Sequence, residues 1–121
     1  MLATPDFIVD FVTRGDTGEE WRMVLVEEGP WNPPYDDEMR RLQTRLYDCV
    51  DAALDGQLAS KFPDSRGKRV VVQLDGYRLP ESEVESFFSR FAAGALTTEE
   101  YRTALASSTY VSAISFELNL N

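Results

Sequence analysis

Apolar and polar residues alternate along two stretches near the start of the chain. In residues 7–13 and again in residues 20–27, every second side chain is apolar, and several are β-branched or aromatic. A period of two predicts β-strands. The sequence Arg-Gly-Asp-Thr-Gly between the two stretches contains residue types that tight turns favour. We therefore predict a β-hairpin over residues 7–27.

The apolar period changes to three and four residues beyond the proline-rich segment 29–34. The new pattern starts at Asp36 and predicts an amphipathic helix that continues or restarts after Gly56 and ends before Pro63.

Two further strands and two further helices complete the predicted set. The apolar residues of 68–75 and 109–118 predict strands, the first of them in the interior of a sheet. Ser82 and Thr97 each precede a glutamate by three residues, which is the spacing of a capping box and predicts that a helix begins there.

These elements predict a single α+β domain over residues 1–121 with the order β-β-α-β-α-α-β. A hairpin followed by two later strands predicts a four-stranded, mainly antiparallel sheet with the helices packed on one face. The side chains predicted to face this core are Phe7, Val9, Phe11, Trp21, Met23, Leu25, Val70, Val72, Leu74, Ile114, Phe116 and Leu118.

The opposite face of the predicted sheet mixes apolar and charged side chains, a composition typical of an interface. Its predicted members are Ile8, Asp10, Val12, Arg22, Val24, Val26, Val71, Gln73, Ala113, Ser115 and Glu117. We expect Val12, Val24, Val26 and Val71 to form the contact if the protein is a homodimer.

Composition narrows the range of functions. The chain has no histidine, one cysteine, and 21 acidic against 12 basic residues, for a net charge of −9. Histidine is the side chain best suited to proton transfer near neutral pH and the commonest metal ligand. We therefore expect no catalytic residue, no metal and no cofactor. Negative charge disfavours binding to nucleic acid or an anionic membrane and favours a basic protein partner.

The sequence also favours a cytoplasmic location. We find no basic leader followed by a long apolar stretch at the N-terminus. A lone cysteine within a helical pattern, Cys49, suits a reducing compartment.

Acidic and aromatic residues flank the proline-rich segment and form the candidate partner site. Its members are Glu27, Glu28, Trp31, Tyr35, Asp36, Asp37 and Glu38. The stiff segment would hold the two aromatic residues as anchors beside the carboxylates. A plainer interpretation is that the acidic residues stabilise the start of a helix and the aromatic residues cover the core. The acidic spacing does not match a calcium loop, so we expect no metal here.

Several residues resemble the pattern of a small bacterial domain family of unknown function. Leu42-Gln43-Thr44-Arg45-Leu46 matches a helix motif L-Q-x-[KR]-[IL], and residues 62–68 match a turn motif [YF]-P-D-x-x-G-K. Gly56 lies 13 residues after Gln43, as in that family. The resemblance covers residues 7–75 and departs from the family at the helix start, where a histidine is often found. It implies the hairpin, the Trp-containing acidic loop and the long helix, but no activity and no catalytic residues.

The sequence thus predicts a non-enzymatic protein-interaction domain, such as a bacterial immunity-type or antagonist protein that binds a basic partner. Two alternatives stay open. The first is a small acidic secretion or assembly chaperone that acts as a dimer through the mixed sheet face. The second is a small enzyme that works without histidine or metal.

Overall fold

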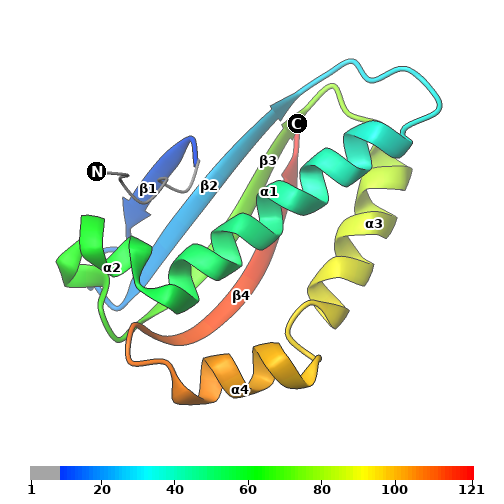
Figure 1. Cartoon of the computed structure of the whole chain (residues 1–121). Helices are drawn as coiled ribbons and strands as arrows, with labels where there is room; N and C mark the ends of the chain where they lie inside the picture. The colour runs from blue at the N-terminus through cyan, green and yellow to red at the C-terminus, as the bar shows by residue number, and fades with distance from the viewer. Residues whose placement is uncertain (1–8) are drawn as a thin grey trace, which may run out of the picture.

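Four strands form a single sheet in the order β1-β2-β3-β4 in the computed structural model, which describes residues 9–121 (Figure 1). The strands are β1 (Phe11–Arg14), β2 (Glu20–Glu28), β3 (Lys68–Tyr77) and β4 (Val111–Leu120). β1 pairs antiparallel with β2, whereas β2 with β3 and β3 with β4 are parallel pairs. The fold is α+β with a mixed sheet, and the prediction of a mainly antiparallel sheet is wrong.

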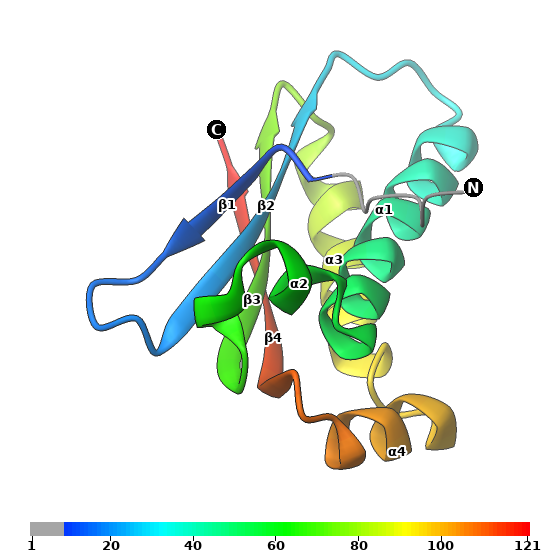
Figure 2. The same ribbon diagram turned by 60° about the vertical axis from the view of Figure 1, so that its left-hand side comes forward.

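The parallel pairs depend on the helices between the strands. α1 (Asp36–Asp55) and α2 (Gln57–Lys61) connect β2 to β3, and α3 (Glu81–Gly94) and α4 (Glu99–Ser107) connect β3 to β4. Two parallel neighbouring strands need such a crossover, because the chain must return to the end of the sheet at which the first strand began. Right-handed crossovers that step in one direction place their helices on one face of the sheet. Figure 2 shows α1 and α3 together on one side of the sheet.

The long helix predicted from Asp36 is divided at Gly56. This glycine has φ +94°, a left-handed conformation that ends α1, and α2 restarts at the next residue. The observed order is therefore β-β-α-α-β-α-α-β, with one helix more than predicted and a short 3₁₀ turn at Pro63–Ser65 before β3.

Neither predicted capping box forms at its expected residue. α3 begins after Pro80 without a side-chain cap, so Ser82 lies inside its first turn. The cap of α4 is Thr98 rather than Thr97, and its hydroxyl accepts a hydrogen bond of 3.3 Å from the Tyr101 backbone N–H. Adjacent threonines offer the same cap, and the sequence alone does not distinguish them.

The core fills the space between the sheet and the helices. Met23 and Leu25 of β2 and Val72 of β3 are fully buried, as the alternation in these strands predicts. The opposing surface comes mainly from α1, where Leu42 and Cys49 are fully buried at helical spacing. Burial raises the pKa of the Cys49 thiol to about 12, so the residue packs as a small apolar side chain.

The first strand differs from its prediction in length and in phase. Phe11 pairs with Val24 and Val12 pairs with Met23, so Val12 faces the core and Phe11 faces away from it with 58% of its surface exposed. The predicted faces of Phe11 and Val12 are therefore reversed. A bend at Asp10 interrupts the alternation, and Val9 before it still packs against the core. The expectations for Phe7 and Ile8 fall outside the described residues.

Replacing Gly56 by alanine should destabilise the fold more than the same change at Gly67. Both glycines have positive φ, so each alanine adds strain of about 1 kcal/mol. A Cβ at Gly56 would also lie 2.8 Å from the Tyr110 ring, whereas a Cβ at Gly67 meets no atom within 4 Å. We expect Gly56→Ala to cost about 1 kcal/mol more, because the ring must move. Urea unfolding of both variants measures the difference, and an equal loss would contradict it.

Candidate functional site

The proline-rich segment runs from the end of β2 to the start of α1. Its Trp31 is partly buried and packs against the core, as the plainer interpretation expects. The Trp31 ring also lies 6.5 Å from the Tyr35 ring, at an angle of 48°. Tyr35 directly precedes α1 and lines a hollow on the surface. The two aromatic residues therefore form one unit that reaches from the core to the surface.

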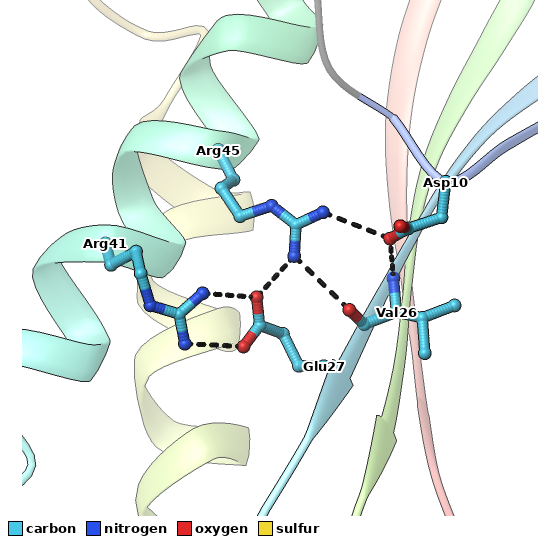
Figure 3. A network of polar contacts seen from close by, with 5 residues as sticks. All are labelled: Asp10, Val26, Glu27, Arg41 and Arg45. Atoms are coloured by element: carbon cyan, nitrogen blue, oxygen red, sulfur yellow. Dashed lines mark hydrogen bonds and ion pairs between the residues drawn. The ribbon is translucent and has the colours of Figure 1, made fainter.

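Glu27 is not part of the exposed acidic surface. Only 3% of the residue is accessible, and the side chain meets two arginines of α1 (Figure 3). Arg41 donates two hydrogen bonds to its carboxylate, each of 2.7 Å. Arg45 donates another to the same carboxylate and forms a 3.0 Å ion pair with Asp10. We call these four residues the Glu27 cluster.

The Glu27 cluster joins α1 to the sheet and to the residues before β1. Burial raises the pKa of Glu27, but the hydrogen bonds from Arg41 and Arg45 outweigh this effect and leave the pKa below its usual value. Asp10 also accepts a 2.6 Å hydrogen bond from the backbone N–H of Val26. Two carboxylates and two guanidinium groups balance each other here. Glu27 is thus committed to the fold and is not free to bind a basic partner.

The other predicted acidic residues have different environments. Asp37 is exposed and pairs with Arg40 at 3.0 Å. Glu28 is exposed at the end of β2, and Asp36 lines the same hollow as Tyr35. Glu38 turns one carboxylate oxygen inward, where no described residue bonds to it. Asp36, Asp37 and Glu38 make up the acidic first turn of α1, which suits the positive end of the helix dipole.

A hollow of about 520 Å³ lies between the start of α1 and the first three turns of α3. We call it the upper hollow. Because β2 and β3 are parallel, both helices begin at the same end of the sheet. Tyr35, Asp36 and Met39 line one side, and Ser82, Glu83, Ser86, Phe87 and Arg90 line the other. The upper hollow thus combines apolar surface with two carboxylates, and its single cation, Arg90, donates a 2.6 Å hydrogen bond to Ser86.

The α3 side of the upper hollow was not predicted. The three- and four-residue spacing of Val84, Phe87, Phe88 and Phe91 predicts one buried stripe. Val84, Phe88 and Phe91 are buried, but Phe87 is only partly buried and lies at the surface of the hollow. A prediction that β2 and β3 are parallel would have placed the N-terminal half of α3 beside the start of α1. The available signal was the alternation of strand and helix after the hairpin.

The sheet face away from the helices carries a polar network over its valines. Arg22 bonds to Gln73 at 2.7 Å and pairs with Glu117 at 3.0 Å. Val24 and Val71 on this face are already buried, at 5% and 6% exposure. Of the residues predicted for a contact with a second copy, Val24, Val26 and Val71 lie on this face, whereas Val12 lies on the core side.

The described residues offer neither a cluster of metal ligands nor a helix suited to a bilayer. Within residues 9–121, no group of three or more His, Cys, Asp and Glu side chains is placed to hold a metal ion. No helix in this range combines the length and the apolar character that crossing a membrane requires.

Comparison with protein-family models, with curated proteins and with solved structures gave no match to this chain. The resemblance to a small bacterial family therefore stays a prediction, and the site is interpreted from its own geometry.

Replacing Glu27 by glutamine should lower the free energy of unfolding at pH 7 by about 3 kcal/mol, since it leaves Arg45 partly buried without its main counter-charge. The native pKa of Glu27 lies below the unfolded value near 4.5, so its charge stabilises the fold above that pH. As the pH falls through the native pKa, wild type loses this contribution and the two proteins converge.

Urea unfolding at several pH values measures both effects. Glu28→Gln removes the neighbouring, exposed carboxylate and is the matched control, with an expected change below about 0.5 kcal/mol. An equal effect of the two substitutions would show that the Glu27 cluster does not stabilise the fold.

Proposed function

We propose that this protein is a non-enzymatic interaction domain that blocks a basic partner protein, as an immunity-type or antagonist protein does. The observation that carries the proposal is the upper hollow, where Asp36 and Glu83 border apolar side chains. The proposal includes a cytoplasmic location.

The chemistry of the upper hollow suits an arginine or lysine side chain. The aliphatic stem of such a residue can pack on Met39 and Phe87, and its charged end can reach a carboxylate. The rings of Tyr35 and Phe87 also attract a cation that lies over their faces. The overall charge of −9 adds long-range attraction, which accelerates association with a basic surface.

The proposed site keeps only part of the site predicted from the sequence. Tyr35 and Asp36 stay in it, and Glu83, Phe87 and Arg90 of α3 join them. Glu27 leaves it, because its charge is satisfied within the Glu27 cluster. Trp31 supports Tyr35 from the core side.

The test of this proposal is a titration with a short unstructured peptide that carries two arginines around one leucine. Amide NMR shifts should change at Asp36, Met39, Glu83 and Phe87. The double variant Asp36→Lys/Glu83→Lys should weaken binding at least tenfold, because both carboxylates are lost from the upper hollow. Raising the salt from 0.05 to 0.5 M should also weaken binding, since the Debye length falls from about 14 Å to about 4 Å.

The matched control is Asp37→Lys/Glu85→Lys. It changes the net charge by the same amount on the same two helices, at exposed residues that do not line the upper hollow. Equal weakening by both double variants would mean that net charge alone attracts the peptide and would contradict the proposed site.

A dimeric chaperone is the second candidate function. It is favoured by Phe11 and Tyr77, the exposed large apolar residues of the described chain, at 58% and 40% exposure. Their strand registers with Val24 and Glu28 place both on the sheet face away from the helices. A second copy would bury them there.

Sedimentation equilibrium of Phe11→Ser tests this candidate. If the sheet face joins two copies, wild type should be a dimer at micromolar concentration and the variant a monomer with unchanged far-UV circular dichroism. Phe11 is preferable to Val24 for this purpose, because a charge at the buried Val24 would also disturb the fold. A monomeric wild type would rule this candidate out.

A further inference from the structure

Two further hollows lie along α1 beyond the upper hollow in the described part of the chain. The middle hollow, of about 460 Å³, lies between Gln43 and Tyr47 of α1 and Phe91 of α3. The lower hollow, also of about 460 Å³, lies between Leu54 of α1 and Tyr101 of α4. Each hollow lies between α1 and a neighbouring helix. Together the three hollows extend along the whole length of α1.

The three hollows adjoin one another, and we call the row of them the groove. Phe87 and Arg90 line both the upper and the middle hollow. The middle and lower hollows meet at the pair Tyr47 and Tyr101, whose rings stack at 5.8 Å. The Tyr101 hydroxyl donates a 2.8 Å hydrogen bond to Asp51, which fixes the ring at this junction. The lining of the groove therefore mixes apolar and aromatic side chains with polar and charged ones along its length.

The spacing of the groove follows the repeat of a helix. Met39, Gln43, Tyr47, Asp51 and Asp55 line it at intervals of four residues, a stripe that turns around α1 by about 40° at each step. At 1.5 Å per residue, this stripe extends over about 24 Å. The hollows follow one another at about eight residues of α1, or about 12 Å.

Charge is distributed unevenly along the groove. Asp36 and Glu83 border the upper hollow, and Asp51, Asp55 and Glu100 border the lower one. Tyr47, Phe87 and Phe91 line the middle hollow together with the polar Gln43 and Arg90. Among the residues that line the three hollows, Arg90 is the one cation, and it is bonded to Ser86. A complementary ligand is apolar along its length and positively charged toward both ends.

We propose that this groove binds a basic amphipathic helix of a partner protein. The inference rests on the proposed function and specifies the form of its partner. Residues at positions i, i+8 and i+15 of a helix lie on one face at the spacing of the three hollows. The groove walls are helices whose backbone groups are already bonded, so an extended peptide would find no strand edge to pair with, whereas a helix satisfies its own backbone groups.

The probe for this inference is an 18-residue peptide with leucines at positions 2, 10 and 17 and lysines or arginines on both sides of that stripe. It should bind at least tenfold more tightly than the short arginine peptide that fits the upper hollow alone, and its circular dichroism should become helical on binding. A version with a central proline, which prevents a continuous helix, should lose this gain.

The decisive variant is Ala104→Arg on α4. Ala104 lines the lower hollow and is partly buried, so an arginine there fills the hollow and repels a basic helix. Ala106→Arg is the matched control, since it makes the same change on the same helix at an exposed residue outside the hollow. We expect Ala104→Arg to weaken binding of the 18-residue peptide at least tenfold. It should change neither the affinity for the short peptide nor the thermal unfolding midpoint of the protein.

Each outcome separates this inference from the proposed function. Suppose that the short peptide binds, that the 18-residue peptide binds no more tightly, and that Ala104→Arg does not change its affinity. The groove inference is then wrong, and the proposed function stands. If the proline version binds as tightly as the helical one, the ligand is not a helix. If neither peptide binds, both proposals fail.

Discussion

Parallel pairing of β2, β3 and β4 is the constraint on which the rest of the structure depends. It requires a crossover after β2 and another after β3, and both crossovers place their helices on one face of the sheet (Figure 2). Because the strands point the same way, α1 and α3 begin at the same end. The upper hollow lies at this end, where loops join strands to helices. The topology thus positions the candidate site before any particular side chain is considered.

The acidic residues of this protein serve two separate purposes. Glu27 is buried with Arg41 and Arg45, and its charge is balanced within the fold. Asp36 and Glu83 lie at the surface of the upper hollow, where a cationic ligand can reach them. A net charge of −9 states how many carboxylates exceed the basic residues but not which ones are available. Only the contacts of each side chain separate structural carboxylates from those that can bind a partner.

Hydrophobic period was sufficient to place most elements but not to pair them. It located the core side chains of β2 and β3 and the buried stripe of α1, because these depend on neighbours two to four residues apart. It did not distinguish parallel from antiparallel strands, because a strand with one face on the core and one face open alternates in the same way in either arrangement. It reversed Phe11 and Val12 because a bend at Asp10 shifts the phase. The partners of Glu27 are 14 and 18 residues away along the chain, beyond the reach of any local pattern.

The two candidate surfaces differ in what binding would require of them. On the open sheet face, Arg22 already bonds to Gln73 and Glu117. A partner that excludes water from this face must therefore preserve those contacts or replace them. In the groove, apolar and aromatic side chains lie beside exposed carboxylates, with which a basic ligand can pair without burying them fully. Desolvation therefore opposes association less along α1 than on the sheet. The charge of the protein also attracts basic partners to the groove, whereas it repels a second copy of the same acidic chain. Both effects favour a basic partner in the groove over self-association through the sheet.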